Sequence, residues 1–203
     1  MKSGSLYKIL KGRAFSEIVY LALCIIRTRI FFSKCRLIRF PIQIRGRNKI
    51  IFSSGFTSGK SCRIEVFSSL NQVGRLKFGK NCQINDNVHI AACESITIGD
   101  NVLIASRVFI SDHNHGRYTG ANPSIPSEPP EKRQLYSSPI VIEDNVWLGE
   151  GVAIMPGVKI GYGCVVGANS VVTKNLPEKT ICVGVPAKII KRYNEITRTW
   201  EKV

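Results

Sequence analysis

The sequence has no CxxC pair, although seven of its 203 residues are cysteines. They are well separated along the chain, at Cys24, Cys35, Cys62, Cys82, Cys93, Cys164 and Cys182. Zinc ribbons and fingers need closely paired cysteines, and the disulfide frameworks of small secreted domains usually need an even number. The pattern therefore indicates reduced thiols in a cytoplasmic protein rather than a zinc site or a disulfide scaffold.

A long apolar run is missing as well. In the N-terminal region the longest run, from Ile18 to Ile26, has nine residues, whereas a membrane-spanning helix needs about 20. Arg27 and Arg29 follow this run where a signal peptide would carry a small-residue cleavage site. We therefore expect neither a spanning helix nor a signal peptide.

Acidic residues are scarce near the N-terminus. Residues 1–47 hold eleven Lys or Arg and one acid, Glu17, and so contribute most of the formal net charge of +15. Basic and apolar residues mixed in this way fit a helix on an anionic membrane surface, which predicts peripheral association with the inner face of the cytoplasmic membrane. The alternative is a basic amphipathic helix packed on the main domain. Nucleic acid is not expected as a partner, because the common binding motifs are absent.

A six-residue repeat fills most of the remaining sequence. From Phe78 onward it includes "IGDNVL IASRVF", stops, and resumes as "IEDNVW LGEGVA IMPGVK IGYGCV VGANSV". The first position is always a large apolar residue, and the second is usually Gly or Ala. This period fits short strands separated by turns and stacked as a solenoid, in which three sixes close one triangular coil. The first residues should point inward, and the "GDN", "EDN" and "GAN" segments should form corners with positive φ.

This repeat, from about Phe78 to Arg192, resembles the hexapeptide-repeat acyltransferases, and most closely the maltose/galactoside acetyltransferase branch with its polysaccharide and O-antigen O-acetyltransferases. The resemblance implies a β fold, a left-handed parallel β-helix solenoid, whose hand opposes the usual crossover preference. We expect residues 1–47 to form a basic amphipathic helical segment. Residues 48–186 should form the β-helix domain with a protruding extended loop at 111–138, and residues 187–203 a short C-terminal helix or tail.

The loop contains the segment "SDHNH", and its four prolines favour an extended arm. In the family such a loop reaches a neighbouring subunit of a trimer, and the active site lies between two prisms. Ungapped alignment with the family pattern places His115 at the catalytic histidine, with His113 as an orienting or acceptor-binding residue. A neutral imidazole can take the proton from a sugar hydroxyl as the oxygen attacks a thioester. His89, the third histidine, is expected on the outer surface.

The resemblance also implies residues that bind the acceptor. Asn85 matches a family residue that contacts the acceptor and helps to stabilise the transition state, and Trp147 matches an aromatic residue beside the groove. Gln83 and Cys93 stand where the galactoside enzymes carry an aromatic residue and a carboxylate. We therefore do not expect a free galactoside as the natural acceptor.

Six further residues match positions that bind acetyl-CoA in the family: Glu150, Ala168, Thr173, Lys174, Lys188 and Lys191. Glu150 replaces a small hydroxyl residue near the thioester. Lys188 and Lys191 replace arginines that pair with the nucleotide phosphates; the charge is kept, but the bidentate geometry is lost. A solvated basic tail is the alternative interpretation of these two lysines.

The predicted function is acetyl-CoA-dependent O-acetylation of a saccharide, either of a surface polysaccharide or of its lipid-linked precursor, without a metal. N-acetylation of an amino sugar and O-acetylation of a small molecule are alternatives within the same class. A non-catalytic solenoid, or one that binds a metal through His89, His113 and His115, is the alternative from another class.

Overall fold

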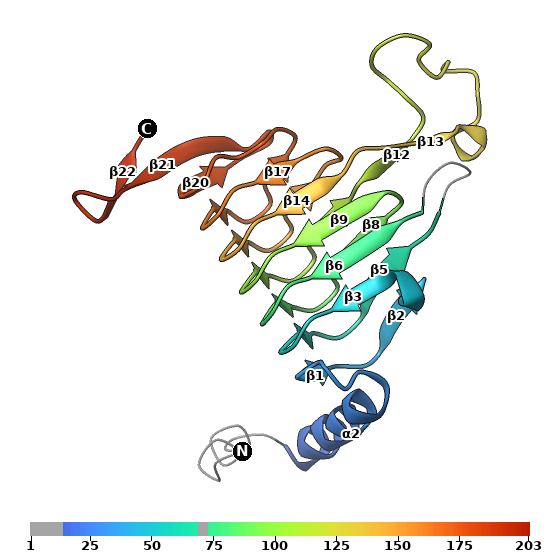
Figure 1. The fold of residues 1–203 in the computed structure, drawn as a ribbon, viewed down its shortest axis with the longest axis vertical. Coiled ribbons are helices and arrows are strands. Elements are labelled where there is room, and N and C mark those ends of the chain that lie inside the picture. The colour runs from blue at the N-terminus through green and yellow to red at the C-terminus, as the bar shows by residue number, and fades with distance from the viewer. Residues whose placement is uncertain (1–13, 69–72) are drawn as a thin grey trace.

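The computed structural model describes residues 14–68 and 73–203, and its strands form a triangular solenoid (Figure 1). One side of the prism, sheet A, contains in spatial order β1 (Leu37–Ile38), β4 (Thr57–Ser58), β7 (Gln83–Ile84), β10 (Leu103–Ile104), β15 (Trp147–Leu148), β18 (Val165–Val166), β20 (Thr180–Val183), β21 (Lys188–Asn194) and β22 (Thr199–Lys202). The pairing is parallel from β1 to β20.

Two further sheets complete the prism. Sheet B contains β2 (Ile42–Arg45), β5 (Cys62–Val66), β8 (His89–Ala92), β11 (Phe109–Ser111), β16 (Ala153–Ile154) and β19 (Val171–Val172). Sheet C contains β3 (Ile50–Phe52), β6 (Arg75–Phe78), β9 (Ser95–Ile98), β14 (Ile140–Ile142) and β17 (Lys159–Ile160). Each coil takes one strand from each sheet in turn, and a one-turn 3₁₀ helix, η1 (Arg47–Lys49), precedes β3. The parallel solenoid expected from the repeat is confirmed.

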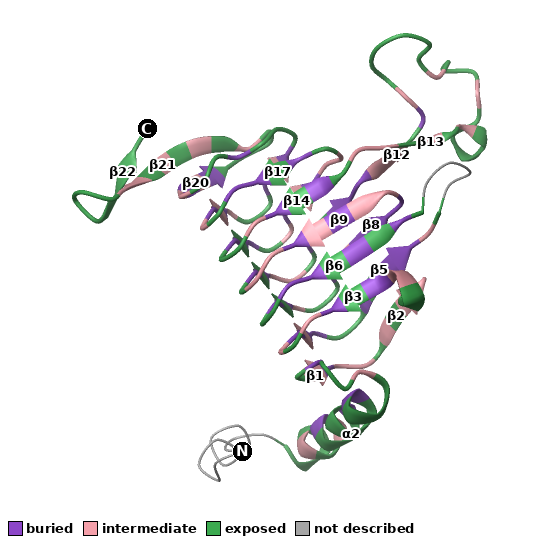
Figure 2. Cartoon of the chain, in the orientation of Figure 1, coloured by how far each residue is buried: buried purple, intermediate pink, exposed green. Residues whose placement is uncertain are grey.

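The interior is a set of aliphatic columns. In sheet A, Ile84, Ile104, Leu148 and Val166 are direct register partners from coil to coil, and each is at most 1% exposed. Corresponding residues of sheets B and C are equally buried (Figure 2). Burial of these side chains supplies the main driving force for folding, and the first position of each six points inward as predicted.

Asparagine and glycine occupy the corners. Asn81, Asn101 and Asn145 all have φ between 55° and 58° at successive corners between sheets C and A. Asn tolerates this left-handed region better than most residues with a side chain, which explains why it recurs in the repeat. The cysteines fill interior positions instead: burial raises the pKa of the Cys62 and Cys82 thiols to about 11 each, so both stay protonated at neutral pH.

Helix α2 (Phe15–Phe31) lies across the N-terminal end of the solenoid (Figure 1). The buried Thr28 Oγ1 accepts a hydrogen bond of 2.8 Å from the backbone N–H of Ile38 and donates one of 2.7 Å to the Cys24 carbonyl. Tyr20 Oη donates to the Phe40 carbonyl at 2.7 Å. A helix in the N-terminal segment is therefore confirmed at Phe15–Phe31, and residues 1–13 of that segment lie outside the described residues. The solenoid strands already begin at Leu37, before the boundary expected at residue 48.

The loop at 111–138 leaves the prism between β11 and β14, as expected (Figure 1). Its base is an antiparallel pair, β12 (His113–His115) and β13 (Leu135–Ser137), and it contains one 3₁₀ turn, η2 (Pro130–Lys132).

The prediction of a short C-terminal helix is wrong. Residues 188–194 and 199–202 form the antiparallel strands β21 and β22, which extend sheet A beyond β20. The segment alternates between less and more exposed residues and contains Ile, Tyr, Thr and Trp, which favour strands. The free edge of β20 provides backbone groups with which such a strand can pair.

Candidate functional site

The side chain of Asp112 fixes the point at which the loop leaves the prism. It is fully buried; Oδ1 accepts a 2.8 Å hydrogen bond from the backbone N–H of Cys93, and Oδ2 accepts bonds of 2.8 Å from Glu94 and Ser95. The backbone N–H groups belong to the corresponding corner of the preceding coil. Such hydrogen bonds hold a buried carboxylate in one position.

His113 follows this carboxylate directly. Its Nδ1 lies 3.0 Å from Asp112 Oδ1 and 3.3 Å from Ser111 Oγ, and the ring packs edge-on against Phe67, with centroids 4.9 Å apart. The side chain is 11% exposed. A carboxylate beside Nδ1 favours the tautomer in which that nitrogen carries the proton, so Nε2 has a free lone pair. The ring is thus oriented as a general base requires.

His115 has a different environment. It is exposed and lies on β12 opposite Leu135. Its backbone carbonyl accepts a 2.6 Å hydrogen bond from Tyr118 Oη, but in residues 14–68 and 73–203 no hydrogen bond or ion pair involves its imidazole. The loop therefore presents one oriented histidine and one exposed histidine.

His89 is half-buried on the outer face of sheet B, away from the loop, and is less exposed than predicted. Its Nε2 lies 3.4 Å from Glu65 Oε2, and Arg63 and Arg45 pair with the same carboxylate at 2.7 and 2.9 Å. Burial opposes ionisation of Glu65, but the hydrogen bond and charge of Arg63 outweigh it and hold the pKa of this carboxyl below its usual value. His89 is part of this ion-pair cluster.

A second group of predicted site residues lies on sheet A and its border with sheet B. Asn85 is half-buried, and its Oδ1 accepts a 3.1 Å hydrogen bond from Gln83 Nε2. Trp147 is 49% exposed on the outer face of sheet A, between Leu103 and Val165 in register. Ala168 is exposed at the same border, three coils beyond Asn85 along the prism.

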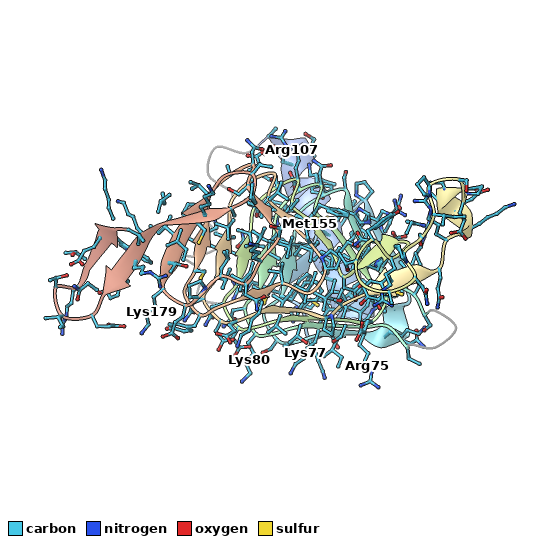
Figure 3. The ribbon with its side chains drawn as sticks, turned by 90° about the horizontal axis from the view of Figure 1, so that it is seen from above. Arg75, Lys77, Lys80, Arg107, Met155 and Lys179 are labelled. Atoms are coloured by element: carbon cyan, nitrogen blue, oxygen red, sulfur yellow. The ribbon has the colours of Figure 1, made fainter. Side chains whose placement is uncertain are left out.

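Glu150 at this border forms an ion pair of 2.5 Å with Arg107, which the sequence did not single out. Both side chains are exposed, and Arg107 lies on the opposite side of the molecule from Arg75, Lys77 and Lys80 (Figure 3). The two residues are 43 positions apart in the sequence and lie in successive coils, so only the stacking of the coils reveals that they pair. Arg107 is thus the partner of the Glu150 carboxylate.

At Gly149 two neighbouring coils approach each other closely. A Cβ at Gly149 would lie 2.7 Å from the Ala168 backbone nitrogen and 2.9 Å from the Val166 carbonyl oxygen of the next coil. Because these are backbone atoms, the contact could not be relieved by a side-chain movement. The coils therefore stack backbone on backbone here, close to Trp147.

The remaining predicted residues are placed as follows. Thr173 and Lys174 are exposed after β19, at the border of sheets B and C that also carries the loop. Lys188 and Lys191 lie on β21, Lys188 exposed and Lys191 half-buried. Cys93 is 1% exposed, so its thiol is not presented to an acceptor as predicted; its backbone N–H caps Asp112 instead.

The candidate site thus forms two groups on opposite borders of sheet B. The loop edge, between sheets B and C, carries Asp112, His113, His115, Thr173 and Lys174. The Asn85 edge, at sheet A and its border with sheet B, carries Gln83, Asn85, Trp147, Glu150 and Ala168. One copy of the chain does not bring the two edges together. Within the described residues, no cluster of three His, Cys, Asp or Glu side chains could hold a metal ion.

Comparison with known proteins identifies the family. Residues 139–174 match the family described as bacterial transferase hexapeptide (six repeats). A protein of Escherichia coli (strain K12), named "Putative lipopolysaccharide biosynthesis O-acetyl transferase WbbJ", is 49% identical over 196 residues, which cover 96% of this chain and 98% of that protein. The chain belongs to the hexapeptide-repeat acetyltransferases.

Other members of the family agree in sequence and structure. Galactoside O-acetyltransferase of Escherichia coli (strain K12) is 34% identical over 76% of this chain and 72% of that protein. A structure of galactoside acetyltransferase in complex with coenzyme A is 36% identical with a TM-score of 0.54, covering 73% of this chain and 72% of the other. The solenoid is thus the left-handed parallel β-helix of the hexapeptide-repeat acetyltransferases, and the chain is an acyltransferase.

Proposed function

We propose that this chain transfers the acetyl group of acetyl-CoA to a hydroxyl group of a saccharide, either in a surface polysaccharide or in its lipid-linked precursor. The observation that carries the proposal is the imidazole of His113, oriented by the buried Asp112 at the base of the loop. The name of the relative at 49% identity, which refers to lipopolysaccharide biosynthesis, supports an acceptor of this class.

The reaction is a direct transfer. Nε2 of the neutral imidazole takes the hydroxyl proton while the acceptor oxygen attacks the thioester carbonyl. The tetrahedral intermediate then breaks its C–S bond, and coenzyme A leaves as a thiolate that regains the proton from the imidazolium. A thiolate is a good leaving group because the pKa of a free thiol is only about 8.5. No covalent acyl-enzyme is needed.

Alignment with the family and the geometry of the loop favour different histidines as the base. Family alignment without a gap favours His115. The geometry favours His113, because a base should have one ring nitrogen fixed and the other free, and Asp112 provides the fixed partner. We assign the base to His113 and give His115, which is exposed on β12, a contact with the acceptor or with a neighbouring subunit.

The complete site lies between two copies of the chain. Asn85 and His113 lie on opposite borders of sheet B, so an acceptor held by one copy's Asn85 meets the imidazole of another. A closed trimer repeats this contact three times. In each groove one copy supplies the loop edge with Thr173 and Lys174, and the next supplies the Asn85 edge with Trp147 for the pantetheine arm. Lys188 and Lys191 are available to the nucleotide phosphates.

The acceptor is unlike a free galactoside. Gln83 replaces an aromatic side chain, and Cys93, which replaces a carboxylate, is buried. The experiment that tests the proposed function compares the polysaccharide of the host with and without this gene by mass spectrometry. We expect an acetyl increment on a saccharide only when the gene is present. An unchanged polysaccharide, together with no release of coenzyme A by the purified chain, would contradict the proposal.

A further inference from the structure

Helix α2 exposes a continuous row of large apolar side chains. With 3.6 residues per turn, spacings of four and three keep these residues on one side of the helix. The row, called here the helix stripe, consists of Phe15 (81% exposed), Val19 (41%), Leu23 (56%), Ile26 (55%) and Ile30 (66%). Large apolar rows of this kind on a folded protein mark a surface that contacts a partner or a membrane.

The helix stripe is not the face by which the helix packs on the solenoid. Leu21, Cys24 and Thr28 are buried on the other side of α2, where Thr28 bonds to Ile38. Tyr20 also faces the solenoid, since its hydroxyl reaches the Phe40 carbonyl. Docking of the helix onto the first coil is therefore complete without the helix stripe.

Positive charge flanks the helix stripe. Arg27 and Arg29 lie on either side of it, and in residues 14–68 and 73–203 neither forms an ion pair. The Arg27 guanidinium lies 3.7 Å above the Phe40 ring. Glu17, the single acid of residues 1–47, is in helical register with the buried residues Leu21, Cys24 and Thr28 instead. An apolar row between cations is complementary to the acyl chains and anionic headgroups of a bilayer.

The surface at the C-terminal end of α2 has the same character. A cavity of about 310 Å³ is lined by apolar Phe31, Phe32 and Ile50–Phe52 and by basic Lys34 and Arg47, with Ser33 and Cys35. Phe31 and Ile51 are 65% and 59% exposed. Apolar surface with cations at its margin therefore continues past the end of the helix.

We propose that the helix stripe docks the protein on the surface of an anionic lipid bilayer, with α2 lying in the interface. Among the described residues no helix has the length and apolar character to cross a bilayer, so the contact is peripheral. α2 closes the N-terminal end of the solenoid (Figure 1), and the prism therefore stands on the membrane. This geometry selects a lipid-linked saccharide as the acceptor, a consequence that rests on the proposed function.

Flotation of the full chain with vesicles tests the docking surface. The probes are vesicles of phosphatidylcholine alone and vesicles with 30 mol% phosphatidylglycerol, a composition chosen as about that of an anionic membrane. We expect binding to the anionic vesicles, reduced more than about tenfold in Leu23→Ser/Ile26→Ser because apolar burial is lost. Arg27→Gln and Arg29→Gln should each reduce it about fivefold and weaken its dependence on salt.

The matched control is Ile196→Ser/Val203→Ser. Both residues are large, apolar and exposed, 94% and 72%, at the other end of the molecule. This variant should bind vesicles like the wild type. Equal vesicle binding by Leu23→Ser/Ile26→Ser and the control would overturn the proposal. Circular dichroism and release of coenzyme A check that the helix variants remain folded and active.

If something other than a bilayer covers the helix stripe, the measurements give different results. If a second copy covers it, Leu23→Ser/Ile26→Ser lowers the solution mass by light scattering. If residues 1–13 cover it, only a chain lacking residues 2–13 binds vesicles. Either result overturns the proposal for the intact protein. Vesicle binding with no acetyl transfer to any saccharide would keep the docking surface and contradict only the proposed function.

Discussion

At the residue scale, Asp112 connects the fold with the chemistry. Its carboxylate closes a corner of the preceding coil through three backbone N–H groups and also orients His113. The sequence predicted a catalytic histidine in this segment but gave no role to Asp112. The carboxylate's partners, Cys93 to Ser95, are 17 to 19 residues earlier in the chain, and only the stacking of coils brings them together.

The two loop histidines should differ in their effect on catalysis. His113→Ala should reduce the rate of transfer about 10²–10⁴-fold, the usual cost of losing a general base. His115→Ala should cost less than about tenfold, because the proton acceptor remains. The measurement is coenzyme A release in the presence of the acceptor polysaccharide. If His115→Ala is the inactive variant and His113→Ala retains activity, the alignment without a gap is right and our assignment of the base is wrong.

Interior and exterior residues of one strand should differ in stability. Ile104 is fully buried in the sheet A column, whereas the adjacent Leu103 is 37% exposed. We expect Ile104→Ala to lower the free energy of unfolding by about 2–5 kcal/mol, because a cavity is left between two coils. Leu103→Ala is the matched control and should cost about 1 kcal/mol or less. Equal losses in urea unfolding would contradict the inward orientation of the repeat's first position.

At the element scale, the six-residue period predicted the coils where it is regular and missed them where it is interrupted. From β10 onward the period follows the strands, apart from the loop. The first coil, with β1, β2 and β3, contains η1 and a four-residue β2, so its residues do not fall into sixes. Aromatic residues pack inside it instead: Phe52 of β3 stacks on Phe78 of β6 in the next coil, with ring centroids 5.3 Å apart.

The C-terminal strands could not be predicted from local pattern alone. The segment "KIIKRYN" alternates at the period of a strand, but it is short and rich in Lys and Arg, which also suit a helix end. The deciding factor is tertiary, since β20 leaves an edge on which β21 can pair. The α2 helix was predictable, because a continuous apolar and basic run of this length fits a helix. The sequence did not show which side of α2 packs on the solenoid, because that side is marked by the hydrogen bond between Thr28 and Ile38.

Docking of α2 should depend on a single hydroxyl group. Thr28→Val keeps the shape of the side chain but leaves the Ile38 N–H without its acceptor, at a cost of about 1–3 kcal/mol. The expected result is faster proteolysis before Leu37 with the rest of the chain intact. Thr119→Val, at an exposed loop position, is the control and should be cleaved like the wild type. If Thr28→Val is cleaved no faster than the wild type before Leu37, other contacts hold the helix and the prediction is wrong.

At the scale of the whole molecule, the two halves of the site lie on opposite borders of sheet B. Most of the predicted residues are exposed along the prism, and the sequence could not show that they divide between two edges. Because the coils place Asn85 and His113 at different borders of sheet B, the proposed mechanism needs a second copy of the chain. The proposed mechanism therefore depends on the assembly of several copies of the chain.

Mixing two inactive variants tests whether the site is shared between copies. His113→Ala lacks the base on the loop edge, and Asn85→Ala lacks the acceptor contact on the Asn85 edge, so each alone should be nearly inactive. In every mixed trimer one groove joins an intact His113 to an intact Asn85. Coexpression in equal amounts should therefore restore about a quarter of wild-type coenzyme A release. If the mixed sample stays as inactive as its components, the site is not shared between copies, and the account is wrong.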